Sequence, residues 1–149
     1  MALKENLYII IIGCGRLGSY LANNLSRSGH SVVVVDNDES SFASLSTSFS
    51  GFQIVGDAAE FSVLKQAKID QADALITSTQ EDNLNLMIAQ VAKTIFHVPK
   101  VMARVFDPSR EKIYREFGIE TICPTSLAGD LFLESMIIFF KTKIVGTLE

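Results

Sequence analysis

Residues 7–18 have the sequence LYIIIIGCGRLG, in which a short apolar run leads directly into three spaced glycines. The run Leu7–Ile12 is almost entirely apolar, which predicts a parallel strand buried on both faces of a sheet. Gly13, Gly15 and Gly18 then follow the pattern GxGxxG, and apolar residues recur after them at helical spacing. A strand, a glycine turn and a helix in this order predict the start of a βαβ unit.

The three glycines have separate tasks in such a turn. Gly13 permits the tight turn, Gly15 lets a diphosphate approach the backbone, and Gly18 lets the helix pack closely on the sheet. The amino terminus of the helix offers unpaired N–H groups and partial positive charge to phosphates. The alternative is a turn that serves only the strand–helix connection and binds no ligand.

An acidic residue follows at the distance expected for a dinucleotide-binding unit. Asp36 comes directly after a second apolar run, residues 31–35. Its carboxylate can accept hydrogen bonds from ribose hydroxyls, and it would repel a 2′-phosphate. The sequence therefore predicts binding of NAD(H) or an adenosine phosphate, with NADP disfavoured.

The rest of the chain alternates short β-branched runs with segments of helical periodicity, which is typical of repeated βαβ units. We expect an α/β fold of the Rossmann type, a doubly wound parallel sheet of six strands in the order 3-2-1-4-5-6 with helices on both faces. A ligand would bind across the carboxyl ends of the strands, where the strand order reverses. The expected strands are Leu7–Ile12, Ser31–Val35, Phe52–Val55, Ala74–Thr77, Lys100–Val105 and Ile119–Cys123.

The helices of the first half have recognisable signals. One helix opens at Gly15 and ends at Gly29, and Asp57 with Glu60 indicates a capping box before a short helix. Residues 40–50 contain six serines and a threonine, which predicts a poor helix with one apolar face. The side chains expected to be buried in these segments are Leu17, Tyr20, Leu21, Leu25, Phe42, Leu45, Phe49, Phe61 and Leu64.

Three more helices are expected in the second half. Asp107 and Pro108 are typical of an N-cap and a first helical position, and Gly118 ends that helix. The last helix begins at Pro124. The remaining helix starts at about Asp82 and repeats apolar residues along one face: Leu84, Ile88, Val91, Ala92 and Ile95.

Length and composition bound the function. The 149 residues suit one domain, residues 1–149, without room for a second substrate-binding domain. The formal net charge of −4 gives no general attraction to nucleic acid, so we expect no nucleic-acid partner. Cys14 and Cys123 match no metal-ligand spacing, and no metal site is expected. Two isolated thiols fit a reducing cytoplasm better than they fit a disulfide.

Four polar residues at the expected strand ends have two explanations each. Arg16 could reach a phosphate or be an exposed helix arginine. Asp57 suits contact with an adenosine, but a capping role is favoured. Thr79 could line the second half of a ligand site, cap the next helix, or do both. Arg104 ends an apolar strand and needs a partner, which a phosphate or the Asp107 carboxylate could supply.

These residues together resemble the nucleotide-binding regulatory domain of potassium channels and transporters, called RCK or KTN (TrkA-N). The resemblance runs over nearly the whole chain. Its most specific parts are the arginine inside the glycine loop and the glycine–aspartate pair after the third strand. The matching pieces, in the family's order, are Gly13-Cys14-Gly15-Arg16-Leu17-Gly18, Val35-Asp36, Gly56-Asp57-Ala58, Thr79 with Asp82 and Asn85, Ala103-Arg104-Val105, and Pro124.

The resemblance implies a cytoplasmic regulatory subunit that binds NAD(H), ATP, ADP or AMP and gates a potassium transporter or channel. Such a subunit is held peripherally at the inner face of the membrane through its transporter. The resemblance places Arg16 and Arg104 near phosphates and Asp36 at the ribose, and it gives Asp57 a place in the pocket as well as a cap. The expected cofactor-binding residues are Gly13, Cys14, Gly15, Arg16, Leu17, Gly18, Asp36, Asn37, Asp57, Ala58, Ser78, Thr79 and Arg104.

The chain departs from the family pattern in two respects. Asn83 stands where an acidic residue is common, and Thr125 follows Pro124 where some members have glutamate, which argues against a divalent-cation site. The family's smaller second subdomain is not expected within these 149 residues, because the chain ends soon after its last helix. The chain is then a one-domain member or a piece of a longer one.

The last helix is apolar around more than one face. A helix of this kind must be buried, and one domain has limited room for it. In the family the equivalent helix crosses to a partner. We therefore expect a homodimer through Leu127 to Phe140, with packing into the chain's own core as the alternative.

We expect a sensor and not an enzyme. Hydride transfer needs a surface that holds the substrate and an acid or base, and no such constellation of residues is present. Cys14 could be a thiol of lowered pKa at a helix start, although packing inside the loop is the favoured interpretation. The alternative function is an NAD-dependent oxidoreductase or a cofactor-binding fragment of one. A redox-responsive transcription factor would need a basic patch or a DNA-binding helix pair, and the sequence has neither.

Overall fold

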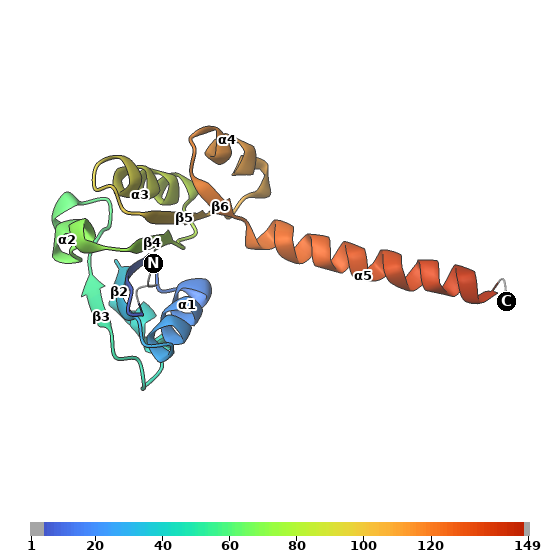
Figure 1. Ribbon diagram of the computed structural model, residues 1–149, viewed down its shortest axis with the longest axis horizontal. Coiled ribbons are helices and arrows are strands. Elements are labelled where there is room, and N and C mark those ends of the chain that lie inside the picture. The colour runs from blue at the N-terminus through green and yellow to red at the C-terminus, as the bar shows by residue number, and fades with distance from the viewer. Residues whose placement is uncertain (1–4, 148–149) are drawn as a thin grey trace.

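The computed structural model describes residues 5–147, which fold around a six-stranded sheet (Figure 1). The strands are β1 Tyr8–Ile12, β2 Ser31–Asp36, β3 Phe52–Val55, β4 Ala74–Thr77, β5 Lys100–Arg104 and β6 Glu120–Ile122. Their order is β3-β2-β1-β4-β5-β6 and every neighbouring pair is parallel, which confirms the predicted fold class and strand order. The order reverses between β1 and β4, so a crevice is expected at their carboxyl ends.

The described residues also form five helices, of which α5 does not pack on the sheet while the others lie beside it. The helices are α1 Arg16–Arg27, α2 Phe61–Gln66, α3 Asp82–Thr94, α4 Glu111–Glu116 and α5 Pro124–Thr147, with 3-10 turns η1 Glu39–Ser44, η2 Ile69–Gln71 and η3 Pro108–Arg110. On one face, Ile9 and Ile11 of β1 cluster with residues of α1 and η1. On the other, Ile10 and Ile12 cluster with residues of α2 and α3. The near-continuous apolar sequence of β1 and β2 is explained by this burial on both sides.

The side chains that α1 buries differ from the prediction. Tyr20 is 66% exposed, and Leu17, Leu21 and Leu25 are only partly buried. The buried residues of α1 are instead small: Gly18, Ser19 and Ala22. A helix that lies this close to the strands can present only small side chains to them, so its leucines pack at the margin.

The favoured capping role of Asp57 at α2 is wrong, and so is the alternative that Thr79 caps α3. Asp57 accepts a hydrogen bond from the Ala59 N–H at 2.8 Å, and the N-cap residue of α2 is Glu60. Thr79 Oγ1 accepts from the Glu81 N–H at 3.2 Å, and Glu81 is the N-cap residue of α3. In both places the polar side chain accepts the backbone N–H two residues further along, which closes a turn that precedes the helix.

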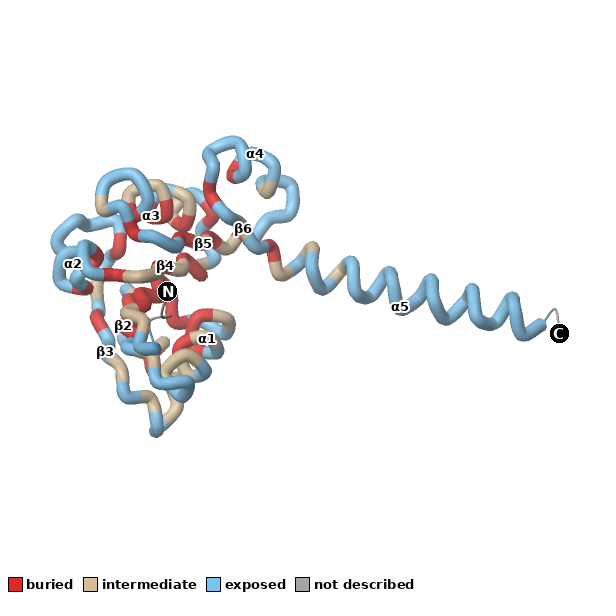
Figure 2. The backbone as a smooth tube through the Cα atoms, in the orientation of Figure 1, coloured by how far each residue is buried: buried red, intermediate tan, exposed pale blue. Residues whose placement is uncertain are grey.

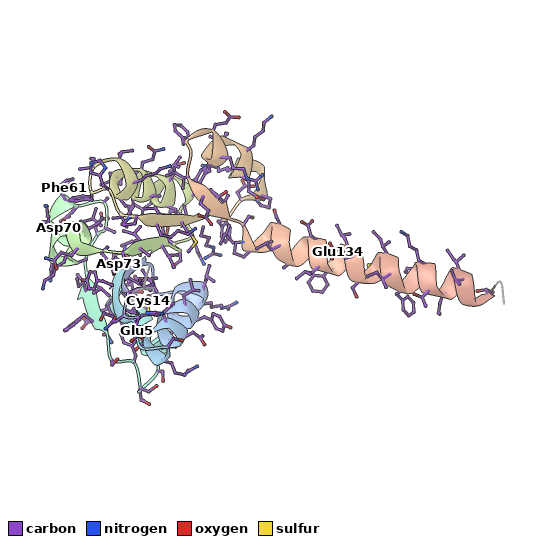
Figure 3. All side chains as sticks on the ribbon, viewed as in Figure 1. Glu5, Cys14, Phe61, Asp70, Asp73 and Glu134 are labelled. Atoms are coloured by element: carbon purple, nitrogen blue, oxygen red, sulfur yellow. The ribbon has the colours of Figure 1, made fainter. Side chains whose placement is uncertain are left out.

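Two aromatic and apolar side chains predicted as core lie at the surface. Phe61, labelled in Figure 3, is half exposed and its ring packs against Phe96 with centroids 5.1 Å apart. Ile95 lies just beyond the end of α3 and is also exposed. Leu64 is buried as predicted.

The predictions for the serine-rich segment and for α4 are confirmed. Residues 39–50 contain only the turn η1, with Phe42 buried and Leu45 and Phe49 packed beside it. Asp107 caps η3 by accepting the Ser109 N–H at 3.0 Å, and Gly118 ends the following helix with φ of 71°.

Helix α5 projects away from the sheet, and the chain covers none of it with its own core (Figures 1 and 2). Its apolar side chains are exposed, including Leu131, Phe132 and Ile137, so packing into this chain's own core is contradicted. A hydrogen bond from Ser126 to Glu111 joins its first turn to α4. Within residues 5–147, no helix combines the length and apolarity needed to cross a membrane.

Candidate functional site

A cleft of about 770 Å³ opens at the carboxyl ends of β2, β1, β4 and β5. It lies at the reversal of strand order, where open α/β sheets bind ligands. All of the predicted site residues except Cys14 and Gly18 line it. The structure therefore brings residues from five separate segments of the chain to one surface.

The glycine loop has the geometry that its spacing predicts. Gly13 has φ of 100°, a conformation that favours glycine. A Cβ atom at Gly18 would lie 1.9 Å from the Gly13 carbonyl oxygen, so the predicted close packing of α1 on the sheet is confirmed. A Cβ atom at Gly15 would meet nothing within 4 Å, which leaves the backbone open to the cleft at the amino terminus of α1.

Asp36 holds the loop and borders the cleft. Its Oδ2 accepts the Cys14 N–H at 2.7 Å, and its Oδ1 accepts the Asp38 N–H at 2.9 Å. Each carboxylate oxygen has a second lone pair, so the group can also accept hydrogen bonds from a ligand's hydroxyls. The same carboxylate thus braces the glycine loop and offers negative charge at the end of β2.

Cys14, labelled in Figure 3, is buried inside the loop with 1% of its surface exposed. Burial, together with the negative charge of Asp36, raises the pKa of its thiol to about 11. The thiol is therefore protonated at neutral pH, contrary to the lowered pKa that a redox-active cysteine needs. Packing inside the loop, the favoured interpretation from the sequence, accounts for this residue.

Both predicted arginines line the cleft. Arg16 is exposed at the first position of α1. Arg104 donates from Nη1 to the Ser78 carbonyl at 3.3 Å, and its guanidinium carbon lies 5.3 Å from the centre of the Phe106 ring. Among residues 5–147, the buried Nε of Arg104 has no hydrogen-bond partner.

The predicted alternative partner of Arg104 is occupied elsewhere. The Asp107 carboxylate accepts hydrogen bonds from the N–H and the hydroxyl of Ser109, which lower the pKa of Asp107. Arg104 lines the cleft, so its guanidinium could bind an anionic group such as a phosphate there.

The polar side chains after β4 make hydrogen bonds within the protein, although both residues also line the cleft. The Ser78 hydroxyl lies 3.0 Å from both the Ile12 and the Gly13 carbonyl oxygens and can donate to either. Ser78 therefore stabilises the glycine turn. The hydroxyl of Thr79 donates to Asn85 Oδ1 at 2.6 Å. Thr79 still lines the cleft with its remaining surface.

Sequence reasoning missed part of the lining. Asp38, Ser41 and Gly56 complete the side near β2, and Gln80, Glu81, Leu84, Phe106 and Pro124 complete the side near β5. Gly56 and Pro124 belonged to the family pattern, and for the others the only available signal was that they lie next to or near predicted positions along the chain. Asn85 belongs to the family pattern quoted above, but the sequence predicted no role for it.

Comparison with known proteins gives a consistent assignment. A model of the TrkA-N domain family matches residues 9–124. The Trk system potassium uptake protein TrkA of Streptomyces coelicolor is 37% identical over 131 residues, which are 88% of this chain and 59% of that protein. A TrkA homolog of Methanothermobacter thermautotrophicus is 30% identical over 131 residues, 88% of this chain and 60% of that one. The chain thus spans about three-fifths of the length of these relatives.

Solved structures share the fold at lower identity. The TrkA-N domain of the inner membrane protein ybaL from Escherichia coli has a TM-score of 0.75 at 20% identity, covering 85% of this chain and 94% of that one. The GsuK channel bound to NAD has a TM-score of 0.75 at 22% identity, covering 89% and 23%. The Kef C-terminal domain of Shewanella denitrificans in an AMP-bound form has a TM-score of 0.74 at 23% identity, covering 89% and 81%.

Proposed function

The chain belongs to the TrkA-N domain family, and we propose that it binds NAD(H) or an adenine nucleotide, ATP, ADP or AMP, in the cleft. The observation that carries the proposal is the uncovered glycine backbone at Gly15, with the Asp36 carboxylate on one side and Arg104 on the other. Asp36 would accept hydrogen bonds from the ribose, the amino terminus of α1 would hold the first phosphates, and Arg104 would pair with a further anionic group. Asn37, Asp57 and Ala58 would border the adenosine.

Titration of the purified, nucleotide-free chain by calorimetry tests this proposal. We expect NAD, NADH, ATP, ADP or AMP to bind and NADPH to bind at least about tenfold more weakly, because Asp36 repels a 2′-phosphate. A folded sample that binds none of these nucleotides would show that the glycine loop is only structural.

We further propose that residues 1–149 form one nucleotide-binding domain of a regulator that gates a potassium transporter or channel. Two relatives are named as potassium uptake proteins, and a structural neighbour is a channel bound to NAD. The regulator would be cytoplasmic and held at the inner face of the membrane through the transporter. Exchange of one ligand for another can shift the regulator between two conformations only if the ligands differ in their relative affinity for those conformations.

The proposal treats the chain as a sensor and not as an oxidoreductase. The buried, protonated Cys14 offers no redox-active thiolate, and the cleft brings together no cysteine–histidine or tyrosine–lysine pair among its lining residues. Steady turnover of NADH with a carbonyl substrate would favour the oxidoreductase instead.

We propose that α5 joins two copies of the chain. An uncovered apolar helix in water is stabilised by association, and residues Leu127 to Phe140 present apolar side chains around it. The wild-type chain is expected to have about twice the 16.3 kDa monomer mass by light scattering at micromolar concentration. The Ile137→Asp variant should shift it to the monomer, since a charge would be buried in the interface.

A matched control distinguishes a specific interface through α5 from nonspecific association of apolar surfaces. Ile113 of α4 is 56% exposed, close to the 53% of Ile137, so Ile113→Asp makes the same change on a different surface. We expect Ile113→Asp to leave the dimer mass unchanged. A monomeric wild-type chain, or equal dissociation by both variants, would contradict a dimer through α5.

A further inference from the structure

We infer that Asn85, which is not part of the cleft surface, is a positioning residue that sets the affinity for the part of a nucleotide beyond its first phosphate. The inference rests on the proposed nucleotide binding. It concerns the half of the cleft over β4 and β5, whereas Asp36 and the glycine loop make up the other half.

Asn85 uses its whole side-chain amide. Its Oδ1 accepts from the Thr79 N–H at 3.1 Å and from the Thr79 hydroxyl at 2.6 Å. Its Nδ2 donates to the Thr79 carbonyl at 2.9 Å and to the Arg104 carbonyl at 3.0 Å. The residue is completely buried, so water cannot replace these bonds. One side chain therefore fixes the backbone after β4 to the backbone at the end of β5.

Both residues that Asn85 fixes line the cleft. Thr79, just after β4, and Arg104, at the end of the adjacent strand β5, both line it. The ends of β2 and β5 are three strand spacings apart, about 14 Å. A mononucleotide with its ribose at Asp36 and its phosphate at the glycine loop would stop short of Arg104. A longer ligand would continue over Thr79 and Arg104.

The first turn of α3 contributes a second, independent brace to the same half. Both carboxylate oxygens of Asp82 accept backbone N–H groups, from Phe106 at 2.6 Å and from Asp107 at 3.0 Å. Phe106 also lines the cleft and carries the ring beside the Arg104 guanidinium. Asn85 thus holds the Arg104 carbonyl, and Asp82 holds the backbone directly after it. The position of Arg104 in the cleft therefore depends on both side chains.

The chemistry of the amide makes the position sensitive to a near-isosteric change. An aspartate at position 85 would keep an acceptor for Thr79 but would have no N–H to donate to the Thr79 and Arg104 carbonyls. The Asn85→Asp variant should therefore loosen the far half of the cleft and leave Asp36, Gly15 and Arg16 in place.

The test compares nucleotides of increasing length. AMP, ADP, ATP and NAD are titrated by calorimetry into the full chain and into Asn85→Asp. We expect the AMP affinity to change less than about twofold, and the ATP and NAD affinities to fall at least about tenfold, because only the longer ligands reach Arg104. Asn24→Asp makes the same chemical change on the exposed face of α1 and should change no affinity.

Loss of stability alone is controlled on the same helix. Ile88→Val removes one methyl group from a fully buried site of α3 and touches no polar contact, so it should lower all affinities equally or not at all. Should Asn85→Asp not fold, Asp82→Asn removes one of the two acceptors of the second brace and is expected to show the same dependence on ligand length.

The outcomes distinguish the inference from the proposed function. An affinity loss that grows with ligand length supports the positioning role. An equal loss for all nucleotides, or none, overturns that role while nucleotide binding itself stands. A wild-type chain that binds no nucleotide overturns both.

Discussion

The Gly18→Ala variant is expected to lose about 3 kcal/mol of folding free energy, measured by urea denaturation followed by circular dichroism. The added Cβ atom would lie 1.9 Å from the Gly13 carbonyl oxygen and 2.8 Å from Ser78 Oγ. The oxygen cannot retreat easily, because Ser78 donates to it and the Gly13 N–H is bound to the Val35 carbonyl at 2.8 Å. Helix α1 must move outward, which opens the packing of Ala22 on the strands.

The control for this loss is another helical glycine. A Cβ atom at Gly129 in α5 would meet nothing within 4 Å. Gly129→Ala should therefore be neutral or gain up to about 1 kcal/mol from helix propensity. A Gly18→Ala variant as stable as the wild type would contradict the close contact between α1 and the glycine loop.

Asp36→Ala is expected to weaken the binding of NADH or an adenine nucleotide by roughly 100-fold, as measured by calorimetry. Removing the carboxylate deletes charge-assisted hydrogen bonds to the ribose, which contribute about 1.5–3 kcal/mol. It also leaves the Cys14 and Asp38 N–H groups without their acceptor, so the glycine loop loses its brace.

Asp36→Asn separates these two effects. The amide has nearly the same shape and keeps one acceptor oxygen, but it carries no negative charge. We expect the preference for NADH over NADPH to shrink in Asp36→Asn, because the repulsion of the 2′-phosphate is removed. A loop that is merely loosened would weaken both dinucleotides alike. Unchanged affinity in Asp36→Ala would show that the ribose is not bound at β2.

The fold could be predicted almost completely from the sequence because its strands are buried on both faces. Continuous apolar runs such as Ile9–Ile12 and Val32–Val35 are typical of buried parallel strands, and the dinucleotide-binding pattern indicated their order. The buried face of α1 could not be predicted in the same way. Burial there is decided by how closely the helix approaches the sheet, and Tyr20 is on the outer side.

The candidate site was predictable where backbone conformation requires a particular residue. Gly13 is required by the positive φ of the turn, and Gly18 by its close contact with the Gly13 carbonyl. The spacing of these glycines can be recognised from the sequence alone. The contacts of Asn85 were not predictable, because they depend on two strand ends that are neighbours only in the folded chain. The cap at Asp107 was predictable, because an Asp before a Pro is a local signal for the start of a helical turn.

The length of α5 gives it mechanical leverage. Its 24 residues extend about 36 Å, and its first residue, Pro124, borders the cleft. If α5 tilted by about 10° about the contact between Ser126 and Glu111, its C-terminal end would move by roughly 6 Å. A displacement too small to alter the sheet would therefore become, at the tip of the helix, as large as a full helical turn.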